Sequence, residues 1–110
     1  MGEKEYFKRL GTTGTARLRV RIETESGRIA QVVVQLEIDV NGDWTPVVRY
    51  DNAHGFPHRD VLDSRGNETK TELSLPDLDS FAAYAEQDLR DRWEWYKERF
   101  LSRHPRRKRT

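Results

Sequence analysis

The fold is decided by residues 16–50, which read ARLRVRIETESGRIAQVVVQLEIDVNGDWTPVVRY. Apolar and polar side chains alternate in two runs, 16–23 and 29–40, and the dipeptide Ser26-Gly27 lies between them. Alternation of this kind is typical of strands that bury one face only. The sequence therefore predicts two antiparallel strands that form a hairpin.

Asn41 and Gly42 predict the next turn. Both central residues of a type I′ turn need a positive φ, and Asn-Gly is the dipeptide that meets this need most readily. A third strand is expected over residues 44–50, followed by extended segments at 59–62 and 68–73 with a polar turn at 64–67. These elements predict an antiparallel β-meander of four to five strands.

The segment after residue 73 has the pattern of a long amphipathic helix. Ser74 and Asp77 are suitable N-caps, and Pro76 fits the first turn because no amide donor is needed there. Apolar side chains then recur every three or four positions: Leu78, Phe81, Ala85, Leu89, Trp93, Tyr96 and Phe100. We therefore predict an α+β fold in which one C-terminal helix of about 25 residues covers one face of the sheet.

Length and composition place limits on the class of protein. A chain of 110 residues supports one core, so we assign residues 1–14 to a flexible lead-in, 15–102 to a single domain and 103–110 to a basic tail. The absence of cysteine excludes disulfides, thiolate metal sites and a cysteine nucleophile. The charged N-terminus and the lack of a long apolar run predict a cytoplasmic protein.

The net charge of +1 is unevenly distributed along the chain. Residues 103–110 contain five basic and no acidic side chains, whereas residues 1–102 contain 15 basic and 19 acidic ones. A basic cluster attracts nucleic acid through electrostatics that do not depend on base sequence. The tail side chains Arg106, Arg107, Lys108 and Arg109 are therefore predicted nucleic-acid contacts, with a solvated terminus as the plain alternative.

Chemistry-bearing residues concentrate in residues 49–60, which read RYDNAHGFPHRD. Gly55 and Pro57 interrupt any regular element, so the segment is expected to form a loop presented by the sheet. They also exclude the helix that would bring His54 and His58 together as metal ligands, and we therefore expect neither a metal nor a cofactor. The alternative is a metal site formed by Asp51, His54, His58 and Asp60 if these side chains converge from the folded loop.

We predict instead a metal-free site for RNA cleavage. His54 and His58 would act as general base and general acid, and Arg49 and Arg59 would contact the phosphate. Asp51, Asn52 and Asp60 are expected to organise the loop through turn hydrogen bonds. The alternative is a purely structural corner, since the sequence contains no complete constellation of nucleophile and base.

In this segment the chain resembles the TumE-like toxins of toxin-antitoxin systems and their uncharacterised relatives. The resemblance is carried by Arg49, Tyr50, Asp51, Asn52, Ala53, His54, Pro57 and His58. It implies a growth-inhibiting toxin that acts on RNA and is neutralised by a helix-turn-helix antitoxin. The chain departs from the family pattern in a shorter interval before the proline-histidine step and in Asp60, where a basic residue or histidine is expected.

The sequence thus favours a small protein that engages nucleic acid, of the toxin-type ribonuclease class, with RNA and an antitoxin as partners and no membrane. The alternative is a non-catalytic interaction module, either a homodimer or a binder of an operon partner. Whether the protein is an enzyme stays open at this point.

Overall fold

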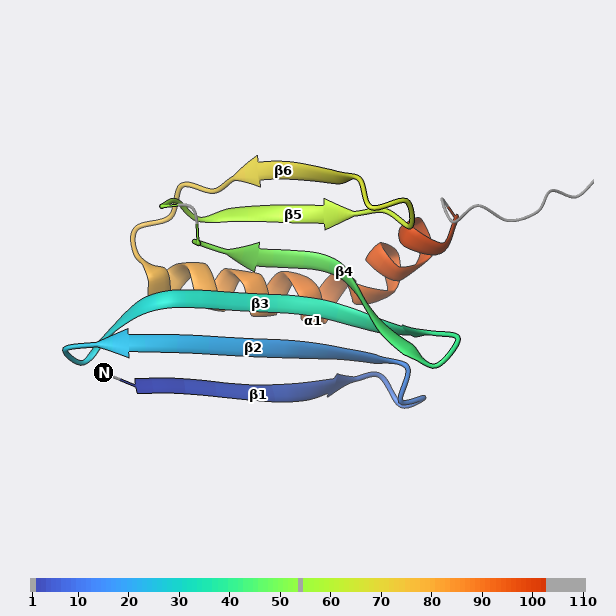
Figure 1. Cartoon of the computed structure of the whole chain (residues 1–110), viewed down its shortest axis with the longest axis horizontal. Coiled ribbons are helices and arrows are strands. Elements are labelled where there is room, and N and C mark those ends of the chain that lie inside the picture. The colour runs from blue at the N-terminus through green and yellow to red at the C-terminus, as the bar shows by residue number, and fades with distance from the viewer. Residues whose placement is uncertain (1, 54, 103–110) are drawn as a thin grey trace, which may run out of the picture.

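The computed structural model describes residues 2–53 and 55–102. Six strands form one antiparallel sheet in chain order, and one helix packs on it (Figure 1). The elements are β1 (Gly2–Leu10), β2 (Ala16–Glu25), β3 (Arg28–Val40), β4 (Asp43–Asp51), β5 (His58–Leu62), β6 (Glu68–Glu72) and α1 (Leu78–Ser102). The predicted α+β meander with a C-terminal helix is confirmed.

The sheet has six strands rather than the predicted four to five, because residues 2–10 do not form a flexible lead-in. They form the edge strand β1, which pairs with β2 from Gly2↔Thr24 to Leu10↔Ala16. On its helix-side face Lys4 and Lys8 flank Tyr6 and separate it from Leu10, so the apolar alternation is interrupted. Edge strands commonly carry such charges, so hydrophobic periodicity does not detect them.

The two faces of the sheet have different environments. Leu18, Val20, Val34, Leu36 and Tyr50 point to the same face, where they are buried against Phe81, Ala85, Leu89, Tyr96 and Phe100 of α1. In Figure 1 the helix lies behind β3 and β4 and runs nearly along the strands. The opposite face has no helix among the described residues.

Local backbone chemistry explains where the elements begin and end. Asp77 caps α1, since its Oδ1 accepts a 2.8 Å hydrogen bond from the Ser80 amide. Asn41 and Gly42 have φ values of 54° and 91°, which confirms the predicted turn. Pro46 lies in β4 opposite Glu37, where the register shifts, so the amide it lacks is not missed by the ladder.

The helix also fixes the β1–β2 hairpin at the edge of the sheet. Lys8 of β1 donates a 2.6 Å hydrogen bond to Glu86 of α1. The turn that follows β1 lies against Trp93, and a Cβ added to Gly11 would approach the ring to 2.9 Å. Gly11 has a φ of +71°, which glycine adopts readily, and its lack of a side chain leaves room for the Trp93 ring.

Gly11→Ala is therefore expected to destabilise the protein more than Gly14→Ala. Both residues have a positive φ, but a Cβ at Gly14 would meet no described atom within 4 Å. Left-handed strain costs each variant about 1–2 kcal/mol, and overpacking against Trp93 adds roughly 1–3 kcal/mol to the first. Urea unfolding of both variants measures the difference. Equal losses would contradict the proposed contact between the hairpin and the helix.

Candidate functional site

Three ionisable side chains converge on the helix-free face of the sheet. Asp51 ends β4, while His58 and Asp60 begin β5. The antiparallel register pairs Asp51 with His58 and Arg49 with Asp60. Because residues two apart in a strand share a face, the pairing brings the imidazole between the two carboxylates. We call these three residues the Asp-His-Asp cluster.

The imidazole of His58 is held on both of its nitrogens. Nε2 lies 3.2 Å from Asp51 Oδ1 and 3.4 Å from Asp60 Oδ2. Nδ1 lies 3.1 Å from the Phe56 carbonyl oxygen, which can only accept a hydrogen bond, so Nδ1 carries a proton and donates it. The Phe56 ring packs against the imidazole with a centroid distance of 5.4 Å. The His58 side chain is only 1% exposed.

Each carboxylate of the cluster is oriented by a second donor. The Ala53 amide donates a 3.0 Å hydrogen bond to Asp51 Oδ1, and Lys70 Nζ donates one of 3.0 Å to Asp60 Oδ1. The hydrogen bond to Asp60 is the main reason that the pKa of Lys70 is raised above its usual value. Lys70 therefore stays charged and offsets one of the two carboxylates.

A polar chain continues from the cluster across the helix-free face. Arg49 Nε donates to Gln35 Oε1 at 2.7 Å, and Gln35 Nε2 donates to Glu37 Oε2 at 2.7 Å. Arg17 Nε donates to the other Glu37 oxygen at 2.8 Å. Gln35 and Glu37 are buried although no helix covers them. Their hydrogen-bonding groups are satisfied within this chain, as buried polar groups require.

This series of hydrogen bonds ends at Arg17, which lies beside two exposed aromatic rings. The Arg17 guanidinium lies between Phe7 and Trp44, with its central carbon 4.3 Å and 4.1 Å from the ring centroids. Phe7 is 50% exposed and Trp44 is 39% exposed. These three residues, which we call the aromatic-arginine stack, line a shallow hollow of about 310 Å³ together with Arg9 and Gly14.

The residues predicted from the sequence do not all meet at one site. Arg49 shares the face of the Asp-His-Asp cluster, but Arg59 points to the other face, where its Nη1 lies 3.4 Å from the Tyr96 hydroxyl. Successive residues of a strand point to opposite faces, and residues 58–60 are strand rather than loop. Asn52 bonds to β3, accepting from the Val32 amide at 3.0 Å and donating to the Ala30 carbonyl at 3.2 Å.

The remaining predicted contacts lie outside the described residues. These are His54 and the tail side chains Arg106, Arg107, Lys108 and Arg109. The proposed pair of imidazoles is therefore represented in the structure by His58 alone. Their roles stay predictions.

Sequence reasoning missed a second polar cluster, which lies on the helix side of the sheet. The hydroxyls of Tyr50 and Tyr96 each donate a 2.6 Å hydrogen bond to the same oxygen, Asp88 Oδ2. Burial is the main reason that the pKa of both tyrosines is raised, to about 12 for Tyr96, and the bond to Asp88 adds to it. Asp88 in an otherwise apolar stripe was the available signal, but its partner Tyr50 is 38 residues away in sequence.

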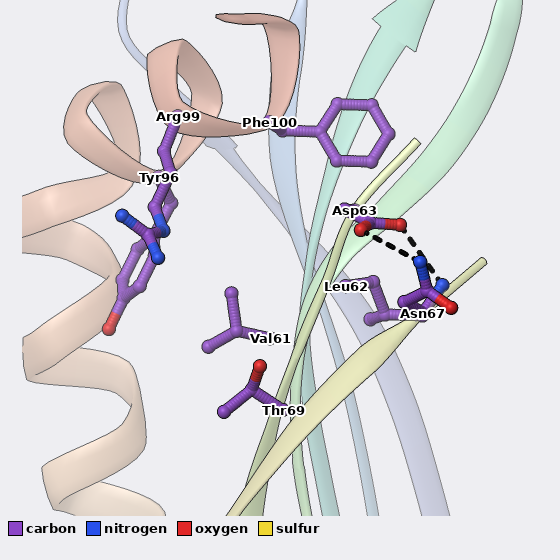
Figure 2. A pocket seen from close by; sticks show the side chains of 8 residues that line it. All are labelled: Val61, Leu62, Asp63, Asn67, Thr69, Tyr96, Arg99 and Phe100. Carbon is purple, nitrogen blue, oxygen red and sulfur yellow. Dashed lines mark hydrogen bonds between the residues drawn. The ribbon is translucent and has the colours of Figure 1, made fainter. Parts of the chain in front are cut away.

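The neighbouring space is too small for a substrate. Figure 2 shows Val61 and Thr69 of the β5–β6 hairpin facing Tyr96 and Arg99 of α1 across a small hollow. Its volume is about 50 Å³. Ligand pockets typically measure about 300–1,000 Å³, whereas a single water needs about 10–15 Å³. This hollow is large enough for water only, and the bond from Tyr50 to Asp88 links β4 to α1.

The sequence matches the Domain of unknown function (DUF7718) over residues 1–106. The chain belongs to this family. No curated protein and no solved structure matched the chain. In the part that the structure describes, no helix is both long and apolar enough to cross a membrane. Membership in DUF7718 leaves the likeness to TumE-like toxins as a prediction.

The shared bonds to Asp88 predict a loss of stability at high pH. The pKa of these tyrosines is higher in the folded protein than the value of about 10 in the unfolded chain. Their bonds therefore stabilise the fold fully below about pH 10, and this stabilisation is lost as the pH rises through the pKa of the folded state. Tyr96→Phe should cost about 1.5–3 kcal/mol at pH 8, and the difference from wild type should shrink between pH 10 and 12.

Urea unfolding at a series of pH values measures this, with Tyr84→Phe as the matched control because Tyr84 is 44% exposed on the same helix. A gap between wild type and Tyr96→Phe that stays constant up to pH 12 would contradict the assignment.

Proposed function

We propose that this protein binds single-stranded RNA on the helix-free face of its sheet and that the aromatic-arginine stack is the base-binding site. The observation that carries the proposal is the exposure of Phe7 and Trp44 on either side of Arg17. Large aromatic side chains are normally buried, and two of them exposed around one guanidinium need a reason.

Single-stranded nucleic acid is the ligand that this surface fits best. Unpaired bases stack on aromatic rings and on arginine planes, and β-sheet faces that present such groups are a common RNA-binding surface. A double helix hides its base faces and is contacted through grooves and phosphates instead. The open hollow beside Trp44 leaves the outer side of the stack accessible to a base.

The charge of this face indicates stacking rather than phosphate contacts. Arg17, Arg19 and Arg21 form ion pairs with Glu37, Glu5 and Glu3 at 2.8, 2.7 and 2.7 Å. Paired arginines release few counterions on binding, so the face alone should bind with a weak dependence on salt. The electrostatic part of the affinity is assigned to the basic tail at residues 103–110, which lie outside the described residues.

The finer proposal, toxin-type RNA cleavage with an antitoxin partner, rests on the likeness to TumE-like toxins. His58 lies on the same face as the aromatic-arginine stack. Trp44 and Asp51 are seven residues apart along β4, or about 23 Å at a rise of about 3.3 Å per residue, which several nucleotides can span. Because His58 is 1% exposed, a reaction there requires movement of the β4–β5 connection and Phe56.

The alternative, a non-catalytic homodimer, is favoured by a different observation. β1 is a nine-residue strand at the edge of the sheet, and its only neighbour among the described strands is β2. An exposed edge of this length can pair with a second chain. A protein that sediments as a dimer and binds no RNA would support this alternative.

Trp44→Ala is expected to weaken binding to a labelled 12-nucleotide RNA by about 5- to 150-fold, because loss of one stacked base costs about 1–3 kcal/mol. Fluorescence anisotropy measures the affinity, and circular dichroism confirms the fold. Trp95→Ala is the matched control, since Trp95 is 50% exposed on the outer side of α1. Equal affinities for wild type and Trp44→Ala, or no binding by wild type, would refute the proposal.

Cleavage is tested separately on the same RNA. If the finer proposal holds, wild type shortens the RNA, and His58→Ala and the less disruptive His58→Asn do not, because both remove the imidazole. Gel analysis of the products measures this, and thermal melting shows whether each variant is folded. Undiminished cleavage by folded His58→Asn would exclude His58 from the chemistry without affecting the binding proposal.

A further inference from the structure

The Asp-His-Asp cluster has the donor set of a transition-metal site. One imidazole nitrogen and two carboxylate oxygens lie within 4.8 Å of one another, supplied by Asp51, His58 and Asp60. All three side chains are more than nine-tenths buried. Buried charges of one sign are costly unless a cation compensates them.

The two distances from His58 Nε2 to the carboxylate oxygens are closer to the spacing of two ligands of one ion than to a short charge-assisted hydrogen bond. A charge-assisted N–H···O bond is about 2.7–2.9 Å long, and the single proton of Nε2 can point at only one oxygen. Here Nε2 is 3.2 Å from one carboxylate and 3.4 Å from the other. Bonds of about 2.0–2.2 Å to a tetrahedral ion place neighbouring ligand atoms about 3.3–3.6 Å apart.

The hydrogen bond at Nδ1 of His58 is compatible with a metal ligand at Nε2. Nδ1 donates to the Phe56 carbonyl, and in the neutral imidazole Nε2 is then the atom that can coordinate an ion together with the two carboxylates. A metal-bound histidine typically donates its other N–H to a backbone carbonyl in this way.

We propose that Asp51, His58 and Asp60 bind one first-row divalent cation such as Zn²⁺ or Mn²⁺. An imidazole among the ligands favours these ions over Mg²⁺ and Ca²⁺, which prefer oxygen donors only. The Ala53 amide and Lys70 orient the two carboxylates from outside the ligand set. The net charge of two carboxylates and Lys70 is −1, so the cluster still attracts a cation.

Asp51, His58 and Asp60 belong to the alternative metal set expected from the sequence, whereas the helical arrangement of two histidines was excluded. That arrangement needed His54 and His58 on a helix, whereas here the ligands come from two paired strands. Metal binding at this cluster does not require RNA binding. It excludes an acid-base role for His58, because a metal-bound Nε2 cannot accept a proton. Since the cluster is buried and its ligands come from both strands, the ion is expected to cross-link β4 and β5 and so stabilise the fold.

The test is calorimetric titration of the full chain with ZnCl₂ or MnCl₂ at pH 7 after removal of metal with EDTA. We expect one ion per chain and, at about 100 times the Kd, a rise in Tm of at least about 5 °C. Asp60→Asn keeps the shape of the side chain but removes a charged ligand, and it should weaken binding at least about tenfold.

Glu68→Gln is the matched control. Glu68 is on β6 with Lys70, on the same face but paired with Leu62 rather than with the cluster, and the variant should bind as wild type does. His54→Ala shows whether another histidine supplies the observed binding, and it should also bind as wild type.

Nitrogen-15 NMR of the histidine side chains identifies the ligand atom. Added Zn²⁺ should shift the Nε2 resonance of His58 and leave its Nδ1 protonated. Three results would each overturn the inference: no stoichiometric binding of either ion, equal binding by wild type and Asp60→Asn, or an imidazole with both nitrogens protonated that Zn²⁺ does not change. RNA binding is measured without added metal, so failure here leaves that proposal standing.

Discussion

The structure depends on burying one face of a wide sheet under a single narrow helix. Six strands at a spacing of about 4.8 Å span roughly 24 Å, whereas a helix with its side chains is about 10 Å across. The helix α1 therefore packs mainly on β3 and β4. Hydrophobic contact with Phe81, Ala85 and Leu89 secures the middle of the sheet, and the flanks need other interactions.

Polar interactions hold both flanks of the helix. On the β1 side Lys8 bonds to Glu86, and Gly11 lets the hairpin approach Trp93. On the β5 side Arg59 reaches the Tyr96 hydroxyl, which itself bonds to Asp88. Bonds to charged groups stabilise by about 1.5–3 kcal/mol when they are buried, but the pair at Lys8, whose side chain is 39% exposed, contributes less, about 0.2–1 kcal/mol. They orient the helix where apolar burial alone would leave it free to rotate.

The face without a helix follows a different rule. Its side chains are charged or amide groups that pair with one another across β2, β3 and β4, so that even buried members such as Gln35 and Glu37 are satisfied. Ion pairs neutralise most of the arginines on this face. The exposed aromatic rings and the Asp-His-Asp cluster are therefore its candidate ligand-binding groups. The two proposed activities thus occupy opposite ends of one polar surface.

Much of the fold could be predicted because its determinants are local. Alternation predicted β2 and β3, Asn41-Gly42 predicted the turn to β4, and the spacing from Leu78 to Phe100 predicted α1. The edge strand β1 could not be predicted in this way, because Lys4 and Lys8 interrupt the apolar alternation of Tyr6 and Leu10. Pairing with β2 is a property of the assembled sheet.

The candidate site was only partly accessible from the sequence for a related reason. The density of polar residues at 49–60 marked the right segment, and Asp51, His58 and Asp60 were all named in it. Treating the segment as one loop placed Arg49 and Arg59 together. In the structure Arg49 of β4 pairs with Asp60 of β5, so Arg59, one residue before Asp60, points to the opposite face.

By itself the sequence determined which residues alternate, turn and cap, because these depend on near neighbours in the chain. Only the tertiary structure decided that His58 lies between two carboxylates, that Arg17 stacks between Phe7 and Trp44, and that Tyr50 shares Asp88 with Tyr96. Each of these clusters draws residues from at least two elements, and strand register or the packing of α1 on the sheet brings their atoms together.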